Sequence, residues 1–306
     1  MSNHAQAVRG RQKRGTIRRM RAPRILLDVP ITFDVGDRQT HAPMVEVTVA
    51  GTATKLILDT GSTDHILTIE LAAQVGLEAE PGEPGTDSTG ASVPSWTLGE
   101  VEVEITGQEY VLRDVVAITA PAPFPGWGVG GFISPQHLQP GAWAVLDLAA
   151  DRFFIVDAEE ADVIAWLTAR TPDLQLLRLE RAPGDATILV RAAIEPFDEV
   201  VTMLDSGGKR TQFTQAAVAG VSDGPQASSG RGVGGTESFG AEVRGQTLIV
   251  GEARLPLEAL IVSTEMDGRD GLVGMDVLRG TELTVSGDPH RPVIWQVARQ
   301  RKWPPG

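Results

Sequence analysis

The chain has 306 residues, no cysteine and a net charge of −13, and 42% of its residues are hydrophobic. This length suffices for a buried core, and the lack of cysteine excludes disulfide bonds, thiolate chemistry and cysteine metal sites. No run of 18 apolar residues occurs, which predicts no transmembrane helix, and an acidic body is a poor nucleic-acid binder.

Residues 1–24 form a basic segment that contrasts with this acidic body, because they hold eight Lys or Arg residues and no acid. They lack the apolar stretch of a secretory signal, so a cytoplasmic location is the default expectation. Their composition predicts a disordered, solvated tail. Two alternatives stay open: a prosegment that docks on the acidic body, and a chain that starts at Met20.

Two β-hairpins are predicted, and each runs into a short loop that contains Asp. Residues 43–61 alternate apolar and polar side chains, turn, and resume as an apolar strand that ends in LDTG. Residues 186–207 repeat this pattern and end in LDSG. Asp59 and Asp205 are therefore both expected where a buried strand gives way to a loop.

The same series of elements follows each loop. Apolar spacing typical of a helix predicts short helices over residues 68–77 and 214–220. In the first half the chain continues with a Gly-rich loop (85–96), alternating strands (98–105 and 110–119), a Gly-apolar-x-Gly segment (126–138) and a closing strand pair (WAVLDL and RFFIVD). The second half repeats this order with a Gly-rich loop (228–240), strands (241–250 and 257–264), a Gly-apolar-x-Gly segment (269–280) and a closing pair (ELTVSG and PVIWQV).

This repeat has a period of about 145 residues, which is the length of a domain and too long for a solenoid repeat. We therefore expect two similar β lobes, residues 25–156 and 174–306. Residues 157–173 are predicted to form a linker helix, since Asp157 supplies a cap and apolar residues follow it. The basic tail 1–24 precedes the first lobe.

The doubled D-[ST]-G motif, each copy followed after about 70 residues by Gly-apolar-x-Gly, resembles the pepsin-like and retropepsin-like aspartic peptidases in a single-chain, two-lobed form. LILDTGST is similar to the catalytic loop of that family, DGLVGMDVL to the Gly segment behind it, and GRGVGG to a retroviral flap hairpin. The resemblance covers about residues 42–300. It implies an all-β, bilobal acid-protease fold, with two β-barrel-like lobes, short helices and a cleft between the lobes.

The chemistry of such a peptidase requires these residue types. Two carboxyl groups held close together cannot both ionise, so one acts as base toward a water molecule while the other acts as acid. The resemblance assigns this catalytic pair to Asp59 and Asp205. The residues predicted to support the pair are the loop positions Thr60, Gly61, Ser62, Ser206, Gly207 and Gly208.

The resemblance further implies roles within these loops. Thr60 and Ser206 are expected to cross-bond the two loops beneath the site. Ser62 is expected to donate a hydrogen bond to the outer oxygen of Asp59, whereas Gly208 has no side chain with which to do the same for Asp205. This asymmetry predicts that Asp205 is the more readily protonated member of the pair.

Substrate contacts are predicted from two Gly-rich hairpins. The candidates are Gly90, Trp96, Gly232, Val233, Gly234 and Gly235. Trp96 is open to two interpretations, as a cover of the cleft or as packing at a strand start. The flap Tyr of pepsin-like enzymes is missing, since Tyr110, which lies in a strand pattern, is the single Tyr of the chain.

The predicted function is that of an aspartic endopeptidase, which works as a monomer because one chain holds both aspartates. It needs no metal or other cofactor, and its partner is a polypeptide bound in extended form, not a nucleic acid or a membrane. The alternatives are a weak or inactive peptide-binding module with the same cleft, a processing enzyme for one cellular partner, and two ordinary Asp-Gly turns at strand ends.

Overall fold

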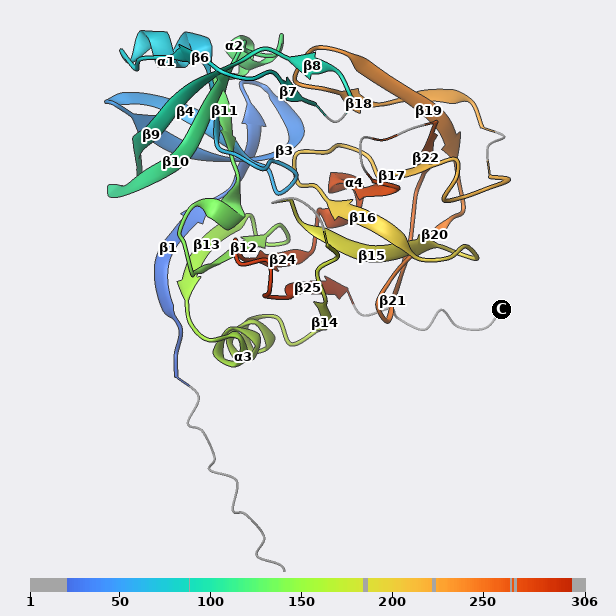
Figure 1. Cartoon of the computed structure of the whole chain (residues 1–306). Helices are drawn as coiled ribbons and strands as arrows, with labels where there is room; N and C mark the ends of the chain where they lie inside the picture. The colour runs from blue at the N-terminus through green and yellow to red at the C-terminus, as the bar shows by residue number, and fades with distance from the viewer. Residues whose placement is uncertain are drawn as a thin grey trace, which may run out of the picture.

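The computed structural model describes residues 21–87, 89–183, 187–221, 224–264, 266 and 269–298. Figure 1 shows a chain built mainly of strands, with one lobe in blue to green and a second in yellow to orange. The predicted all-β, two-lobed fold class is confirmed. Residues 1–20, most of the predicted basic tail, lie outside the described residues. Within the described ranges, no helix is long and apolar enough to cross a membrane.

The first lobe is an eight-stranded sheet that curls on itself, because β3 pairs with β9 as well as with β4. In sheet order its strands are β2 Thr32–Val35, β3 Arg38–Val49, β4 Thr52–Leu58, β11 Val129–Ile133, β5 Ile66–Thr68, β10 Gln108–Ile118, β9 Ser95–Ile105 and β6 Glu80–Pro81. A separate two-stranded hairpin lies beside this sheet and consists of β7 Gly85–Thr86 and β8 Ser92–Val93.

The second lobe is a nine-stranded sheet. In sheet order its strands are β18 Gln226–Arg231, β19 Glu237–Val243, β22 Leu260–Ser263, β17 Gln212–Thr214, β23 Gly271–Val273, β16 Val200–Leu204, β15 Leu189–Ile194, β20 Thr247–Val250 and β21 Ala253–Pro256. The central pairings repeat those of the first lobe. In both lobes the strand that leads to the Asp loop pairs in parallel with a later strand, β4 with β11 and β16 with β23.

A six-stranded sheet joins the two halves of the chain. In sheet order it contains β1 Arg24–Pro30, β13 Arg152–Asp157, β12 Trp143–Asp147, β24 Glu282–Val285, β25 Val293–Ala298 and β14 Leu174–Leu179. Its middle pair, β12 and β24, brings one strand from each half into antiparallel register, for example Ala144 opposite Val285. Because these strands are hydrogen-bonded, the position of one half fixes that of the other.

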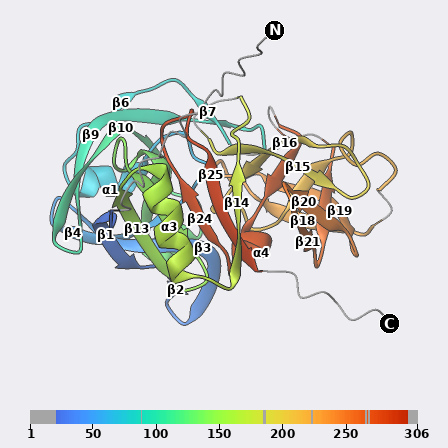
Figure 2. The same ribbon diagram turned by 90° about the horizontal axis from the view of Figure 1, so that it is seen from below.

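Short helices complete the structure, and their bounds are α1 Ile69–Gln74, α2 Phe124–Trp127, α3 Glu160–Arg170, α4 Met275–Leu278 and the 3₁₀ helix η1 Pro135–His137. Figure 2 shows α3 lying against the six-stranded sheet. Val163 and Leu167 of α3 are fully buried there in an apolar cluster with Trp143 and Ile294. Burying a side chain of this size contributes about 1.5–3 kcal/mol, so two such residues suffice to hold the helix in place.

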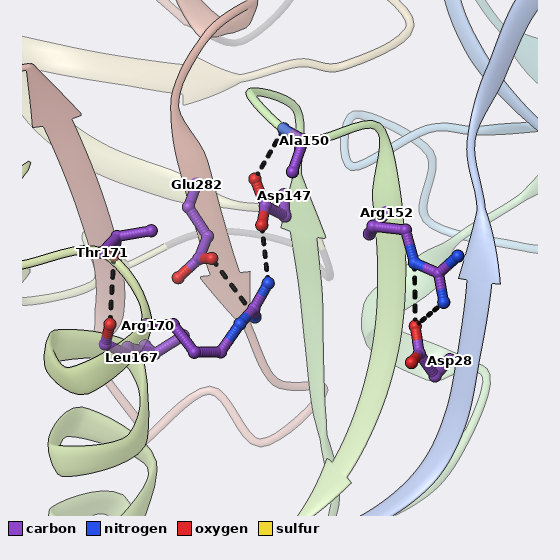
Figure 3. Close-up of polar contacts among 8 residues, drawn as sticks. All are labelled: Asp28, Asp147, Ala150, Arg152, Leu167, Arg170, Thr171 and Glu282. Carbon is purple, nitrogen blue, oxygen red and sulfur yellow. Dashed lines mark hydrogen bonds and ion pairs between the residues drawn. The ribbon is translucent and has the colours of Figure 1, made fainter.

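A buried polar cluster also ties α3 to this sheet, as Figure 3 shows. The Arg170 guanidinium lies 2.7 Å from Oδ2 of Asp147 and 3.4 Å from Oε2 of Glu282. Asp147 and Glu282 are only 2% and 1% exposed, and they come from opposite halves of the chain. Burial, followed by the charge of Asp147, raises the pKa of Glu282 to about 8.

Some local predictions differ from the structure. Asp157, the predicted cap of the linker helix, lies at the end of β13, and α3 instead begins after Glu159, whose side chain makes no cap hydrogen bond. The helix predicted over residues 68–77 forms as α1, which Thr68 caps by accepting a hydrogen bond from the N–H of Leu71. Residues 215–220 instead form turns, because Gly220 with a φ of 90° ends the segment before a second helical turn can add hydrogen bonds. The strand predicted over residues 241–250 divides into β19 and β20 at Gly245, where φ is 74°.

Candidate active site

The parallel strand pairs position the two aspartates. The backbone N–H of Asp59, just after β4, donates to the carbonyl of Ile133 at the end of β11, at 2.9 Å. In the second lobe the N–H of Asp205 donates to the carbonyl of Val273 at the end of β23, at 3.0 Å. Each Asp loop therefore starts from the same hydrogen-bonded corner of its lobe.

The two loops meet, and each carboxyl group packs against the glycine of the opposite motif. A Cβ atom placed on Gly61 would lie 2.8 Å from Cγ of Asp205. A Cβ atom placed on Gly207 would lie 2.6 Å from Cγ of Asp59. These distances leave no room for a side chain, so both positions require glycine for the close approach.

Thr60 and Ser206 cross-bond the loops beneath the carboxyl groups. Each backbone N–H donates to the hydroxyl oxygen of the other residue, at 3.0 Å in both directions. The Thr60 hydroxyl then donates to the carbonyl of Leu204 at 2.7 Å, and the Ser206 hydroxyl donates to that of Leu58 at 2.6 Å. Both hydroxyl residues are fully buried, so every one of these polar groups depends on its partner.

The Asp59–Asp205 pair shares hydrogen bonds unequally. Oδ1 of Asp59 accepts from the N–H of Gly61, whereas Oδ1 of Asp205 accepts from two N–H groups, those of Gly207 and Gly208, at 2.9 Å each. Asp205 is 7% exposed and Asp59 is half-buried.

The pKa values of the pair follow from these contacts. Burial and then the charge of Asp205 raise the pKa of Asp59 well above its usual range. Burial also raises the pKa of Asp205, but the hydrogen bond from Asp59, the N–H groups of Gly208 and Gly207 and the charge of Arg269 lower it again. The hydrogen bonds therefore favour Asp205 as the ionised member of the pair.

This assignment reverses the asymmetry expected from the side chains at positions 62 and 208. The prediction that Ser62 bonds to Asp59 is wrong, because the Ser62 hydroxyl donates to the carbonyl of Asp64 at 2.7 Å. The prediction that Asp205 is the more readily protonated member rested on that bond, and the two N–H groups that donate to Asp205 favour the opposite order. Gly208 acts through its backbone N–H, which stabilises the ionised form of Asp205.

Comparison with known proteins identifies the part of the chain that surrounds the first Asp. Residues 45–133 match the aspartyl protease family. The resemblance to aspartic peptidases is thereby confirmed. A solved structure similar to this chain is the crystal structure of an aspartic proteinase from Irpex lacteus, at 11% sequence identity, with a TM-score of 0.49 over 89% of this chain and 97% of that chain. No curated protein matches this chain.

A buried polar network that the sequence did not indicate lies behind Asp59. The carbonyl of Ser62 accepts hydrogen bonds from the Ser134 hydroxyl at 2.9 Å and from the Gln136 amide at 3.1 Å. His65 accepts from the N–H of Ser134, and burial lowers the pKa of His65 to about 4, so its ring stays neutral. Nothing in the local sequence around His65 predicts this contact, because its partner lies 69 positions away.

A corresponding brace supports the second loop. The N–H and the hydroxyl of Thr211 donate to the Asp276 carboxylate at 2.9 and 2.7 Å, and the Thr211 hydroxyl oxygen accepts from the N–H of Gly274. His41 of β3 also contacts this loop through a hydrogen bond with the backbone of Gly207. This bond raises the pKa of His41, but burial lowers that pKa by more. No motif in the sequence points to Thr211 or His41, whereas Asp276 lies in the DGLVGMDVL segment.

The predicted substrate-contact residues lie in two hairpins, with one exception. Gly90 lies at the tip of the β7–β8 hairpin with a φ of 78°. Gly232, Val233, Gly234 and Gly235 form the tip of the β18–β19 hairpin, where the N–H of Gly235 donates to the carbonyl of Gly232. Trp96 is half-buried in β9, opposite Pro81 and Ala117, so it belongs to the sheet and not to the hairpin tip.

A cavity of about 490 Å³ lies beside α3. Thr168, Leu176 and Arg254 are among the residues that line it, and Asp59 and Asp205 are not. Among the residues that the structure describes, no three His, Asp or Glu side chains gather into a group that could hold a metal ion.

Proposed function

We propose that this protein is an aspartic endopeptidase in which Asp59 and Asp205 together activate one water molecule. The observation that carries the proposal is the reciprocal contact of each carboxyl group with the glycine of the opposite motif. That contact supports a pair of acids, one from each half of the chain, that share one proton. The aspartyl protease match over residues 45–133 supports a peptidase function.

The unequal protonation of the pair assigns the roles. Asp205, the ionised member, takes a proton from water as its oxygen attacks the peptide carbonyl carbon. Asp59 gives its proton to the carbonyl oxygen, so that a neutral diol forms. Asp205 then passes its proton to the leaving nitrogen, the C–N bond breaks, and Asp59 recovers a proton from a diol hydroxyl. The products are a carboxylic acid and an amine, and the pair returns to its starting state.

The substrate is proposed to be a polypeptide in extended form. The edge strand β18 offers backbone N–H and carbonyl groups to a chain that lies alongside it. Because one chain supplies both aspartates, a monomer suffices for the reaction.

The experiment is digestion of a mixed peptide pool by the full chain across pH 3–8, with and without a statine-type transition-state analogue. Asp59→Asn and Asp205→Asn serve as controls, and each is expected to lower kcat by about 10⁴-fold. Cleavage that persists in both variants would exclude this mechanism. Peptides that bind but stay intact would make the chain a binding module, and cleavage confined to one candidate protein would make it a narrow processing enzyme.

A further inference from the structure

The two Gly-rich hairpins, one from each lobe, are bonded to each other through Asp87. This residue follows β7 at the tip of the first hairpin and is only 7% exposed. Its Oδ2 accepts a hydrogen bond of 3.0 Å from the backbone N–H of Gly234, at the tip of the second hairpin. The bond joins residues 147 positions apart, so it is a contact between the lobes.

The two carboxylate oxygens of Asp87 have separate partners. Oδ1 accepts from the N–H of Thr89 at 2.9 Å, from the Thr89 hydroxyl at 2.6 Å and from the N–H of Ala91 at 3.1 Å. These three bonds organise the turn of its own hairpin. The local turn uses Oδ1, so it does not account for the bond that Oδ2 accepts from the second lobe.

The second hairpin is shaped to receive this carboxylate. A Cβ atom on Gly232 would lie 2.0 Å from Oδ2 of Asp87, and one on Gly234 would lie 3.1 Å from it. By contrast, a Cβ atom on Gly230 of the same hairpin would meet nothing within 4 Å. The backbone of the second hairpin can approach Asp87 this closely only because residues 232 and 234 are glycine.

Apolar packing links this contact to the strand that leads to Asp59. Val233 packs against the apolar cluster that contains Val93 of the first hairpin, Ile57 and Ala42. Ile57 precedes Asp59 by two residues, and Ala42 follows His41, which contacts Gly207. Figure 1 shows β7, β8 and β18 close together along the same side of the molecule.

We propose that Asp87 is a latch that holds the two hairpins together in the unliganded protein, and that its bond to Gly234 opens to admit the polypeptide. This proposal rests on the proposed function for its role in substrate admission, although the latch itself is testable without activity. A hydrogen bond to a carboxylate is about twice as strong as a neutral one, which suits a contact that keeps two hairpins from different lobes closed. Asp87 acts on the substrate only through the hairpin, so it is a positioning residue.

Hydrogen exchange of the segment 226–243 tests the latch directly. Asp87→Asn keeps an oxygen for the local turn and replaces Oδ2 by an amide group that cannot accept from Gly234, so we expect the tip to exchange about tenfold faster. Gly232→Ala should act alike, because its methyl group displaces the carboxylate. Thr89→Val, which removes a bond to Oδ1 only, and Gly230→Ala are the matched controls and should leave exchange unchanged. Unchanged exchange in both Asp87→Asn and Gly232→Ala overturns the latch.

A reversible cross-link tests admission. A Cβ atom on Gly234 lies 3.1 Å from Cγ2 of Val93, within reach of a disulfide, and the chain has no cysteine of its own. The double variant Val93→Cys/Gly234→Cys should cleave peptides at least tenfold more slowly when oxidised than when reduced. In Asp87→Asn, KM should change more than kcat. An oxidised form as fast as the reduced one overturns the admission role. If the wild type cleaves nothing while exchange responds as expected, the proposed function fails and the latch stands.

Discussion

Thr60 and Ser206 exchange backbone-to-hydroxyl hydrogen bonds of equal length, 3.0 Å in each direction, across the two halves of the chain. Neither residue touches solvent. This reciprocal contact is what keeps the two Asp loops at a fixed separation, because each hydroxyl also donates to a carbonyl of the opposite strand. The geometry of the Asp59–Asp205 pair therefore depends on two side chains that take no part in the chemistry.

Thr60→Val should destabilise the protein and impair the pair together. Valine has the same shape but leaves the N–H of Ser206 and the carbonyl of Leu204 buried without partners, which costs about 1–3 kcal/mol for each group. We expect the free energy of unfolding in urea to fall by about 2–5 kcal/mol. Thr63→Val, at an exposed hydroxyl in the same loop, is the control and should change it by less than about 0.5 kcal/mol. Equal effects of the two substitutions would contradict the prediction.

Asp59→Asn should make the protein more stable at neutral pH. Because the pKa of Asp59 is raised from its usual 3.8, the folded protein binds a proton that the unfolded chain has released. Stability is therefore lost as pH rises from about 4 toward the folded pKa, by up to about 1.4 kcal/mol per pH unit. Asn imitates the protonated acid and removes this loss, so thermal unfolding of variant and wild type should agree near pH 3 and diverge above pH 5. Asp37→Asn, at an exposed site, should follow the wild type throughout.

Gly208→Ala should damage the pair and not merely shift its pH dependence. The added Cβ atom would lie 2.7 Å from Oδ2 of Asp205 and 3.1 Å from Leu272, so the carboxylate has to move. A displacement of this kind costs about 10²-fold in kcat when the group takes part in the reaction. Gly126→Ala, which meets nothing within 4 Å, is the matched control. An active Gly208→Ala variant with a shifted pH–rate profile would instead support the side-chain asymmetry that the structure contradicts.

Glu282→Gln should flatten the pH dependence of stability between about pH 4.5 and 8. The pKa of this carboxyl group is raised from 4.5 to about 8, so it also binds a proton on folding, and wild-type stability falls as pH rises through that window. The expected slope change is about 1 kcal/mol per pH unit, measured by urea unfolding at several pH values. Glu104→Gln at the exposed surface controls for the change of one charge. A parallel stability curve for Glu282→Gln would show that Arg170 keeps Glu282 ionised.

The fold class and the positions of Asp59 and Asp205 were predictable because the signal is local and occurs twice. A strand pattern followed directly by Asp, a hydroxyl residue and Gly needs no long-range information. The direction of the Ser62 hydroxyl was not predictable, since its acceptor is the backbone carbonyl of Asp64, whose position depends on the conformation of the loop.

The remaining site residues depend on contacts between distant parts of the chain. Ser134 and Gln136 reach Ser62 only because β11 lies parallel to β4, and Thr211 meets Asp276 only because β23 lies parallel to β16. Asp87 lay inside the predicted first Gly-rich loop without any sign of its partner in the other lobe. Residue periodicity predicts which face of a strand is buried, but not which strand lies beside it.

The shared six-stranded sheet has a consequence for attempts to divide the chain. A break between β13 and β14 would give two fragments that each carry half of that sheet, with β12 or β24 as a bare inner edge. An exposed strand edge presents unpaired N–H and carbonyl groups that can pair with a strand of another molecule, so either fragment alone should aggregate. Expressed together, the fragments have complementary edges, and their reassociation offers a route to a split reporter in which recovered activity signals that the two pieces have met.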